Sequence, residues 1–290
     1  MPALQTDDGL PLHLRQWAPA GSVARGTVLI VHGLGEHIGR YEHVAAALTA
    51  DGWQVAGYDQ RGHGASGGPR GSIARPDDLL RDLARVIDLL RGQGAGPLVL
   101  LGHSMGGLVA GRFVAEGQNA RAADWYRPVD ALVMSSPALD PGMRAWQKAL
   151  LAVAEPLFPG LAAGNGLNAG WISRDPKVVA AYKADPLVHD RIVPRLARFI
   201  VDAGQLVRER APHWALPTLL LYAGADRCVA PAGSAAFAAA APAAVVENHC
   251  YAALFHEIFN EPEQAQVLQR LADWLDRRVQ QPAPLARASA

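Results

Sequence analysis

The chain has 290 residues, 50% of them hydrophobic, and its 27 lysines and arginines are balanced by 27 aspartates and glutamates. A chain of this length can bury a substantial core, and its balanced charge, without a block of basic residues, argues against nucleic acid as a partner. Two cysteines are too few for a disulfide framework, and no apolar run is long enough to span a membrane.

The first elements of the chain alternate between predicted strands and predicted helices. Residues 10–17 alternate apolar with polar side chains, as an edge strand does, and the apolar run at 27–31 is typical of a strand buried on both faces. A helix over 41–50 and a strand over 53–58 follow. An amphipathic helix then begins near Pro76, with acidic residues in its first turn and leucines along one face.

The same alternation continues in the second half of the chain. The predicted elements are a strand over 97–101, a helix after Gly106, a strand over 131–134, a strand over 218–222, a helix over 234–240, a strand over 245–250 and a closing helix from Pro262. Regular alternation of this kind predicts an α/β fold, with a mostly parallel sheet covered by helices on both faces.

The alternation breaks between about residues 141 and 211, where the sequence is helical but interrupted by prolines. An insertion at the functional edge of a parallel sheet is expected to form a cap over the site. We therefore expect a core of residues 1–140 and 212–279 and a helical cap over 141–211. The segment 280–290 has two prolines and no core residues, and we expect a disordered tail there.

The most informative segment is Gly102-His103-Ser104-Met105-Gly106, a Gly-x-Ser-x-Gly pentapeptide between a predicted strand and a predicted helix. A serine in such a turn holds its hydroxyl clear of the backbone, and the flanking glycines leave space where side chains would clash. A glycine-rich structural turn is the alternative. The strand-turn-helix context favours a nucleophile elbow with Ser104 as the catalytic nucleophile.

A serine nucleophile needs a base, and the base needs a carboxylate that orients it. In a sheet of this kind the acid and then the base follow the serine along the chain, each on a loop at a strand's carboxyl end. Asp226 follows the strand over 218–222, and His256 lies between the last strand and the closing helix, so we predict these two as acid and base. The rivals are Asp140, which follows the preceding strand, and His249, which lies within the last strand.

Acyl transfer also needs backbone N–H groups that point at the developing oxyanion. One donor is expected at Met105, directly after the nucleophile. The other is expected in the glycine-flanked turn after the strand over 27–31, where the N–H of Leu34 is the best-placed group.

The sequence resembles the monoacylglycerol lipase and lysophospholipase branch of the α/β-hydrolases. The likeness is carried by segments 32–37 with 40–41, 59–67 and 102–107, and segments 224–226 and 256–261 agree with it. The resemblance implies an α/β-hydrolase fold with a helical cap, and a triad of Ser104, Asp226 and His256. It also implies an oxyanion hole at Leu34 and Met105. The implied activity is hydrolysis of single-chain lipid esters through an acyl-enzyme, with no cofactor and no metal.

An apolar stripe in the predicted cap is the candidate substrate-binding surface. A cap over an ester site has to line a tunnel for the acyl group, although part of such a stripe packs the cap on the core. We predict these residues as a tunnel wall or a membrane-facing edge: Trp146, Leu150, Leu151, Val153, Leu157 and Phe158.

Several polar residues in the same motifs have structural interpretations. Glu36, His37 and Arg40 resemble no zinc pattern, and we interpret them as hydrogen-bonding partners that shape their loop. Asp59 is expected to hold a turn. Cys228 lies two residues after Asp226 and is expected to border the site, but nothing places it on an elbow as a nucleophile.

The alternatives in function are a small-ester carboxylesterase, a cofactor-free serine peptidase of the same fold and, less favoured, a ligand-binding member that lacks catalysis. The expected partner is a small ester or single-chain lipid, with transient contact between the cap and a membrane surface. A composition rich in alanine, arginine and glycine suggests a bacterial source. Two cysteines and an N-terminus without signal-peptide features predict a cytoplasmic protein.

Overall fold

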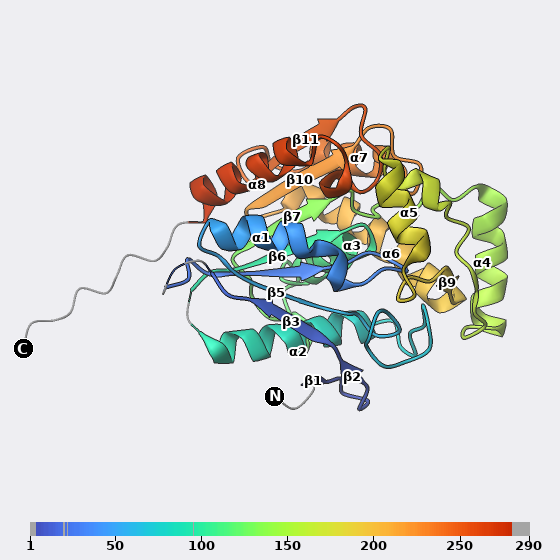
Figure 1. Ribbon diagram of the computed structural model, residues 1–290. Coiled ribbons are helices and arrows are strands. Elements are labelled where there is room, and N and C mark those ends of the chain that lie inside the picture. The colour runs from blue at the N-terminus through green and yellow to red at the C-terminus, as the bar shows by residue number, and fades with distance from the viewer. Residues whose placement is uncertain (1–3, 20, 22, 95, 280–290) are drawn as a thin grey trace, which may run out of the picture.

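A seven-stranded sheet forms the centre of the computed structural model, which describes residues 4–19, 21, 23–94 and 96–279 (Figure 1). The strand order is β11-β10-β7-β6-β4-β5-β3, and all neighbouring pairs are parallel except β3 with β5. The strands are β3 (Leu14–Trp17), β4 (Thr27–Val31), β5 (Gln54–Tyr58), β6 (Leu98–His103), β7 (Ala131–Ser135), β10 (Thr218–Ala223) and β11 (Val246–Tyr251). The predicted mostly parallel sheet is confirmed.

The central strand β4 has the bounds predicted for it, and its side chains pack on both faces of the sheet. Val28 and Ile30 belong to one hydrophobic cluster, whereas Leu29 and Val31 belong to another, as the alternation of a strand requires. All four are fully buried. The predicted edge strand over 10–17 is divided, because β2 (Pro11–Leu12) pairs with β1 (Leu4–Gln5), and only β3 joins the main sheet.

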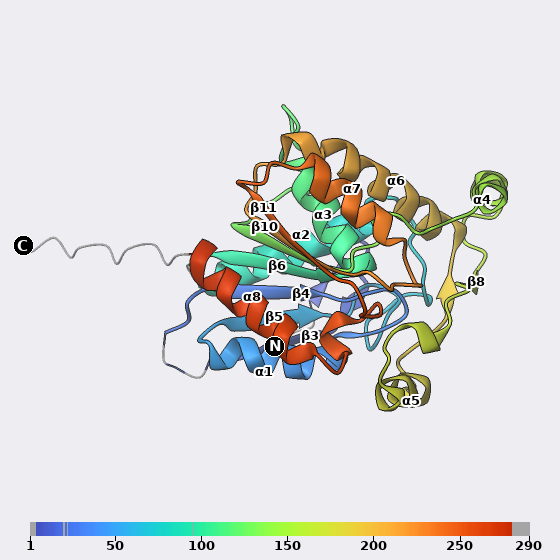
Figure 2. The same ribbon diagram turned by 90° about the horizontal axis from the view of Figure 1, so that it is seen from above.

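Helices cover both faces of this sheet (Figure 2). Residues of α1 and α8 join one hydrophobic cluster, and residues of α2, α3, α6 and α7 join the other. The helices are α1 (Glu42–Ala50), α2 (Asp78–Gln93), α3 (Met105–Glu116), α6 (Pro194–Arg210), α7 (Pro231–Ala240) and α8 (Gln264–Arg278). None of the described helices is long and apolar enough to cross a membrane.

The segment between β7 and β10 contains elements that extend past the main sheet. In both views α4 (Ala145–Leu157) and α5 (Pro176–Ala184) lie at the periphery, on the side opposite the C-terminal end of α8 (Figures 1 and 2). A short antiparallel pair, β8 (Ala163–Gly164) with β9 (Arg191–Ile192), joins the residues that follow α4 to those that precede α6. Single turns complete the chain: η1 (Ile38–Tyr41), η2 (Ala169–Trp171), η3 (Ala211–His213) and η4 (Ile258–Asn260).

Helix α6, which we assigned to the cap, packs on α3 of the core as well as on α4 of the cap. Leu196, Phe199 and Val207 belong to the same hydrophobic cluster as α3. A Cβ on Gly204 would lie 2.5 Å from the carbonyl oxygen of Leu139, so this helix contacts the backbone beyond β7 closely. The division into a core of residues 1–140 and 212–279 and a cap of residues 141–211 remains a proposal. The predicted tail, 280–290, lies outside the described residues.

Candidate active site

The loop between β6 and α3 forms a strained turn at Ser104. Ser104 has φ 54° and ψ −120°, a backbone conformation that residues other than glycine rarely adopt. The glycines on either side are required by packing. A Cβ on Gly102 would lie 2.4 Å from the carbonyl oxygen of Gly106, and one on Gly106 would lie 2.0 Å from that of Val31. The turn therefore has the geometry expected of a nucleophile elbow.

Ser104, His256 and Asp226 form a continuous hydrogen-bonded chain. The Oγ of Ser104 lies 2.8 Å from Nε2 of His256, and Nδ1 of His256 lies 2.6 Å from Oδ2 of Asp226. Asp226 follows β10 and His256 follows β11, so neighbouring strands bring both to the carboxyl edge of the sheet. The other carboxylate oxygen of Asp226 accepts from the backbone N–H groups of Cys228 and Val229, which fixes its orientation.

The imidazole of His256 is positioned to take a proton from Ser104. When Nδ1–H donates to Asp226, the second nitrogen is left to accept from the serine hydroxyl. Burial alone would lower the pKa of His256, but the charge of Asp226 and its hydrogen bond outweigh burial and raise the pKa above the ordinary value. This arrangement suits an imidazole that becomes positively charged during a reaction.

His103, inside the elbow, is a neighbour of the triad that the sequence analysis did not single out. Its ring centroid lies 4.8 Å from that of His256, and its Nδ1 lies 3.1 Å from the hydroxyl oxygen of Ser135. Burial, with the nearby imidazole of His256, lowers the pKa of His103 to about 3. His103 is therefore neutral and packs beside His256 without adding a competing charge.

Asp140 and His249, the alternatives for the acid and the base, have other partners. Asp140 is partly exposed, and its Oδ1 accepts from the N–H of Gly142 at 2.9 Å. His249 lies on the edge strand β11, with its ring 4.4 Å from that of Tyr251. Among the described residues, neither rival hydrogen-bonds to Ser104.

The turn after β4 lies directly against the serine. A Cβ on Gly33 would be 3.2 Å from the Cβ of Ser104. The N–H of Gly33 donates to Oε1 of Glu36 at 2.6 Å and is therefore already used. Leu34 is next along this turn and lines the cavity at Ser104. The geometry is compatible with the predicted donor pair, Leu34 N–H and Met105 N–H.

The polar residues of this turn have the loop-shaping contacts that the sequence analysis predicted. Glu36 accepts from Tyr41 and from Arg40, and Nε2 of His37 lies 2.8 Å from Oδ2 of Asp185 in the cap. Asp59 holds two turns, because its carboxylate accepts from the N–H groups of residues 38 and 65.

A small cavity of about 30 Å³ lies at Ser104, which is room for about one water molecule. The cap contributes mostly apolar or uncharged side chains to its wall, namely Leu167, Asn168, Ala169, Ile172 and Tyr182. This volume is too small for an acyl chain.

The predicted substrate-binding stripe does not line this cavity, and both interpretations of it, a tunnel wall or a membrane-facing edge, stay predictions. Trp146, Leu150, Leu157 and Phe158 on and after α4 are 58% to 63% exposed, whereas Leu151 is buried. The stripe therefore covers more than one face of α4. In Figure 2, α4 lies at the periphery of the molecule, and Trp146, Leu150, Val153 and Leu157 on it are exposed.

Cys228 borders the site, as predicted. Its sulfur, a carboxylate oxygen of Asp226 and a ring nitrogen of His256 lie within 4.8 Å of one another, a spacing that a metal ion could bridge. The chemistry of this set does not fit a metal, because Asp226 and His256 already hydrogen-bond to each other and burial raises the pKa of the thiol. A protonated thiol is also a poor nucleophile.

Comparison with known proteins agrees with this geometry. The family model described as "Serine aminopeptidase, S33" matches residues 22–263. The chain belongs to this family of α/β-hydrolases. A monoacylglycerol lipase of Mycolicibacterium smegmatis is 38% identical to this hydrolase over 263 residues, which is 89% of this chain and 90% of the relative. Phospholipase YtpA of Bacillus subtilis is 28% identical, over 87% and 95% of the two chains.

A solved structure is similar to this hydrolase over almost its whole length. The crystal structure of a monoacylglycerol lipase from Paleococcus ferrophilus aligns with a TM-score of 0.79 and 32% identity, covering 92% of this chain and 99% of that one. The predicted α/β-hydrolase fold and the predicted resemblance to monoacylglycerol lipases are confirmed.

Proposed function

We propose that this hydrolase cleaves carboxylic esters of single-chain lipids, of the monoacylglycerol type, through an acyl-enzyme. The hydrogen-bonded chain from Ser104 through His256 to Asp226 is the observation that carries the proposal. A buried imidazole with a raised pKa, between a hydroxyl and a carboxylate, is the arrangement that activates a serine as a nucleophile.

In the first half of the reaction, Ser104 Oγ attacks the ester carbonyl carbon and passes its proton to Nε2 of His256. The oxyanion that forms is held by the N–H groups of Leu34 and Met105. The tetrahedral intermediate collapses, the bond to the alcohol oxygen breaks, and His256 gives the proton to the departing alcohol. In the second half, water loses a proton to His256 and attacks the acyl-enzyme, and Ser104 regains its hydrogen as the fatty acid leaves.

The substrate class rests on the relatives and on the cap. The 38% identical relative is a monoacylglycerol lipase, whose substrate carries one acyl chain, and another relative is a phospholipase, so a lipid substrate is common to both names. The cap side chains in the cavity wall include Leu167 and Ile172, which are apolar, as a surface that binds an acyl chain has to be. A triacylglycerol would require a much wider mouth.

We further propose that α4 makes transient contact with a membrane surface. All but one of the exposed large hydrophobic side chains among the described residues lie in the cap: Trp146, Leu150, Val153, Leu157, Phe158, Leu161 and Leu167. An exposed apolar patch of this kind is typical of a contact surface, and aromatic residues are favoured at the lipid interface. We place the protein in the cytoplasm, which agrees with two free cysteines.

A serine aminopeptidase of the same fold is the main alternative, and the family description names that activity. Such an enzyme has to hold the positive charge of a substrate amine. Within the described residues, the carboxylates of the cavity wall are Glu36 and Glu257, and both are paired with Arg40. No acidic cap residue lines the cavity in this part of the chain. The ester reaction is therefore favoured.

One experiment separates these possibilities. A fluorophosphonate probe should label the wild-type protein and not the Ser104→Ala variant, because labelling requires an activated serine. Hydrolysis should then be compared for monoacylglycerols of increasing chain length, a lysophospholipid, a p-nitrophenyl acetate and an amino-acid anilide. Highest kcat/KM on a medium- or long-chain monoacylglycerol supports the proposal. A steady decline from acetate would identify a small-ester esterase, and preference for the anilide would identify a peptidase.

A further inference from the structure

Arg40 lies between two carboxylates that come from the loops on either side of the active serine. Its NH1 donates to Oε2 of Glu36 at 2.7 Å and to Oε1 of Glu257 at 2.5 Å, and its NH2 donates to Oε2 of Glu257 at 2.7 Å. The side chains of the three residues are 4% to 11% exposed. The guanidinium therefore joins two segments that are 217 residues apart along the chain.

Each of the two glutamates lies next to one part of the proposed catalytic machinery. Glu36 accepts from the N–H of Gly33, the residue before the proposed oxyanion donor Leu34. Glu257 follows the base, His256, and its own N–H donates to the carbonyl oxygen of Ile172 at 2.8 Å. Fixing these two carboxylates relative to each other fixes the oxyanion turn relative to the imidazole.

The guanidinium itself is set back from the substrate space. In the described part of the chain, the cavity wall includes Glu36 and Glu257 but not Arg40. The ring of Tyr182, from α5 of the cap, covers the guanidinium at 4.7 Å. Water is thus excluded from the ion pairs, which strengthens them. Burial alone would raise the pKa of Glu36, but Arg40 lowers it to about 2, so Glu36 is charged.

We propose that Arg40 is a positioning residue, which holds the oxyanion turn and the His256 loop in register through Glu36 and Glu257. This inference rests on the proposed function. Arginine suits the role because its planar fork grips one carboxylate with two hydrogen bonds and still reaches a second. A lysine at this position would keep the charge but lose the fork. Catalytic groups have to be held within about 0.5 Å of their productive geometry, so loss of the fork should affect turnover before it affects substrate binding.

The test is the Arg40→Lys variant, compared with Arg112→Lys as a matched control. Arg112 also combines an ion pair, with Glu116 at 2.8 Å, and a position over an aromatic ring, that of Trp125 at 5.5 Å, but it lies outside the cavity wall. The readouts are kcat and KM on a soluble p-nitrophenyl ester, the rate of fluorophosphonate labelling, and the Tm. We expect Arg40→Lys to lose roughly tenfold to 100-fold in kcat and in labelling rate, with KM changed less than about twofold. Arg112→Lys should stay within about twofold of the wild type.

A second variant, Glu257→Gln, tests the same bridge even if Arg40→Lys does not fold. Glu257→Gln leaves Arg40 its partner Glu36 but weakens the fork, and it should also lower kcat more than KM. If the bridge acts as one unit, the double variant Arg40→Lys with Glu257→Gln should be within about threefold of the worse single variant. Additive losses, a loss that appears in KM alone, or an equal loss in Arg112→Lys would overturn the inference. Failure of the probe to label the wild type would overturn the proposed function as well, whereas labelling of Arg40→Lys at the wild-type rate would overturn only the role of Arg40.

Discussion

Asp226 is the carboxylate that orients His256, with 2.6 Å between Oδ2 and Nδ1, although Asp140 follows the neighbouring strand of the same sheet. We therefore expect Asp226→Asn to lower kcat on a soluble ester by about 10⁴-fold, because an amide favours the wrong imidazole tautomer. Asp140→Asn is the matched control and should keep kcat within about twofold. A severe loss in Asp140→Asn with a mild loss in Asp226→Asn would transfer the role to Asp140.

The serine and the histidine should behave as a unit. Ser104→Ala and His256→Ala should each lower kcat by several powers of ten, because either change removes the proton transfer that activates the hydroxyl. The double variant should be hardly worse than either single variant. Steady-state kinetics on p-nitrophenyl butyrate, with circular dichroism to check folding, would measure this. Multiplicative losses would show that the two residues act independently.

The pH profile should report the environment of His256. Protonated imidazole cannot take the proton of Ser104, so kcat/KM should fall as the pH falls through the pKa of His256. Because Asp226 raises that pKa, the midpoint should lie above the ordinary value of about 6.5. In Asp226→Asn the cause of the rise is gone and burial dominates, so an NMR titration of the His256 ring should give a midpoint lower than in the wild type. Equal midpoints in the two proteins would contradict this assignment.

The sequence allowed the prediction of features that depend on local pattern. The bounds of β4 follow from an unbroken apolar run, and the turn at Ser104 follows from two glycines that no other residue can replace. The sequence also showed the apolar residues of α4, but a local pattern does not state which of them are buried, as Leu151 is, and which are exposed, as Leu150 is. The contact between Arg40 and Glu257 joins residues 217 apart, and no local pattern carries such a pairing.

Replacing a glycine of the elbow and replacing a glycine of α2 should have opposite effects. In Gly106→Ala the added Cβ would lie 2.0 Å from the carbonyl oxygen of Val31. This is far closer than two such atoms can approach, so either the turn or β4 must shift. We expect the loss of most esterase activity and a lower Tm. Gly92 lies near the end of α2 with no atom within 4 Å of its added Cβ. Gly92→Ala should keep full activity and raise the free energy of unfolding by about 0.5 kcal/mol, since alanine is the better helix former. Thermal melts and ester hydrolysis of both variants would check this, and tolerance of Gly106→Ala would contradict the packing argument.

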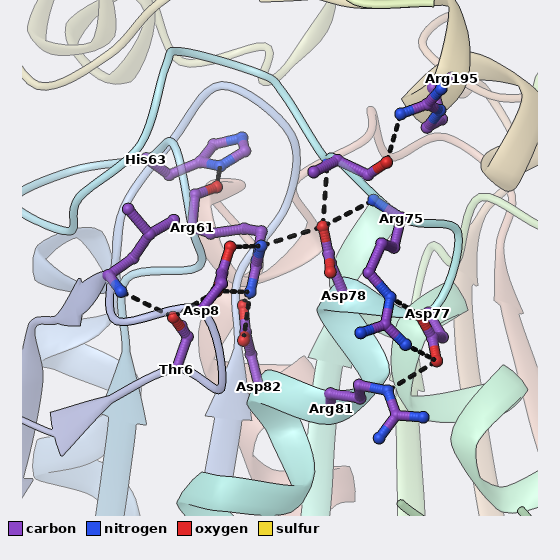
Figure 3. A network of polar contacts seen from close by, with 12 residues as sticks. Thr6, Asp8, Arg61, His63, Arg75, Asp77, Asp78, Arg81, Asp82 and Arg195 are labelled. Carbon is purple, nitrogen blue, oxygen red and sulfur yellow. Dashed lines mark hydrogen bonds and ion pairs between the residues drawn. The ribbon is translucent and has the colours of Figure 1, made fainter.

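A buried cluster remote from the serine predicts a pH effect on stability. The guanidinium of Arg61 is shared by three carboxylates, those of Asp8, Asp78 and Asp82 (Figure 3). With more carboxylates than cations, burial dominates at Asp82 and raises its pKa from 3.8 to about 6, although Arg61 opposes the shift. A carboxyl with a raised pKa contributes its full stability below the unfolded value and loses that contribution as the pH rises through the folded value.

Asp82→Asn removes this titration while Arg61 keeps its contacts with Asp8 and Asp78. The free energy of unfolding of the variant, relative to the wild type, should therefore increase as the pH rises from 4 to 7, by up to about 3 kcal/mol for a shift of this size. Asp88→Asn, on the same helix but exposed and paired with Arg127, is the control and should show no such trend. Urea denaturation at several pH values measures both variants. A difference between Asp82→Asn and the wild type that stays constant with pH, or shrinks as the pH rises, would show that Asp82 is charged in the folded protein throughout this range.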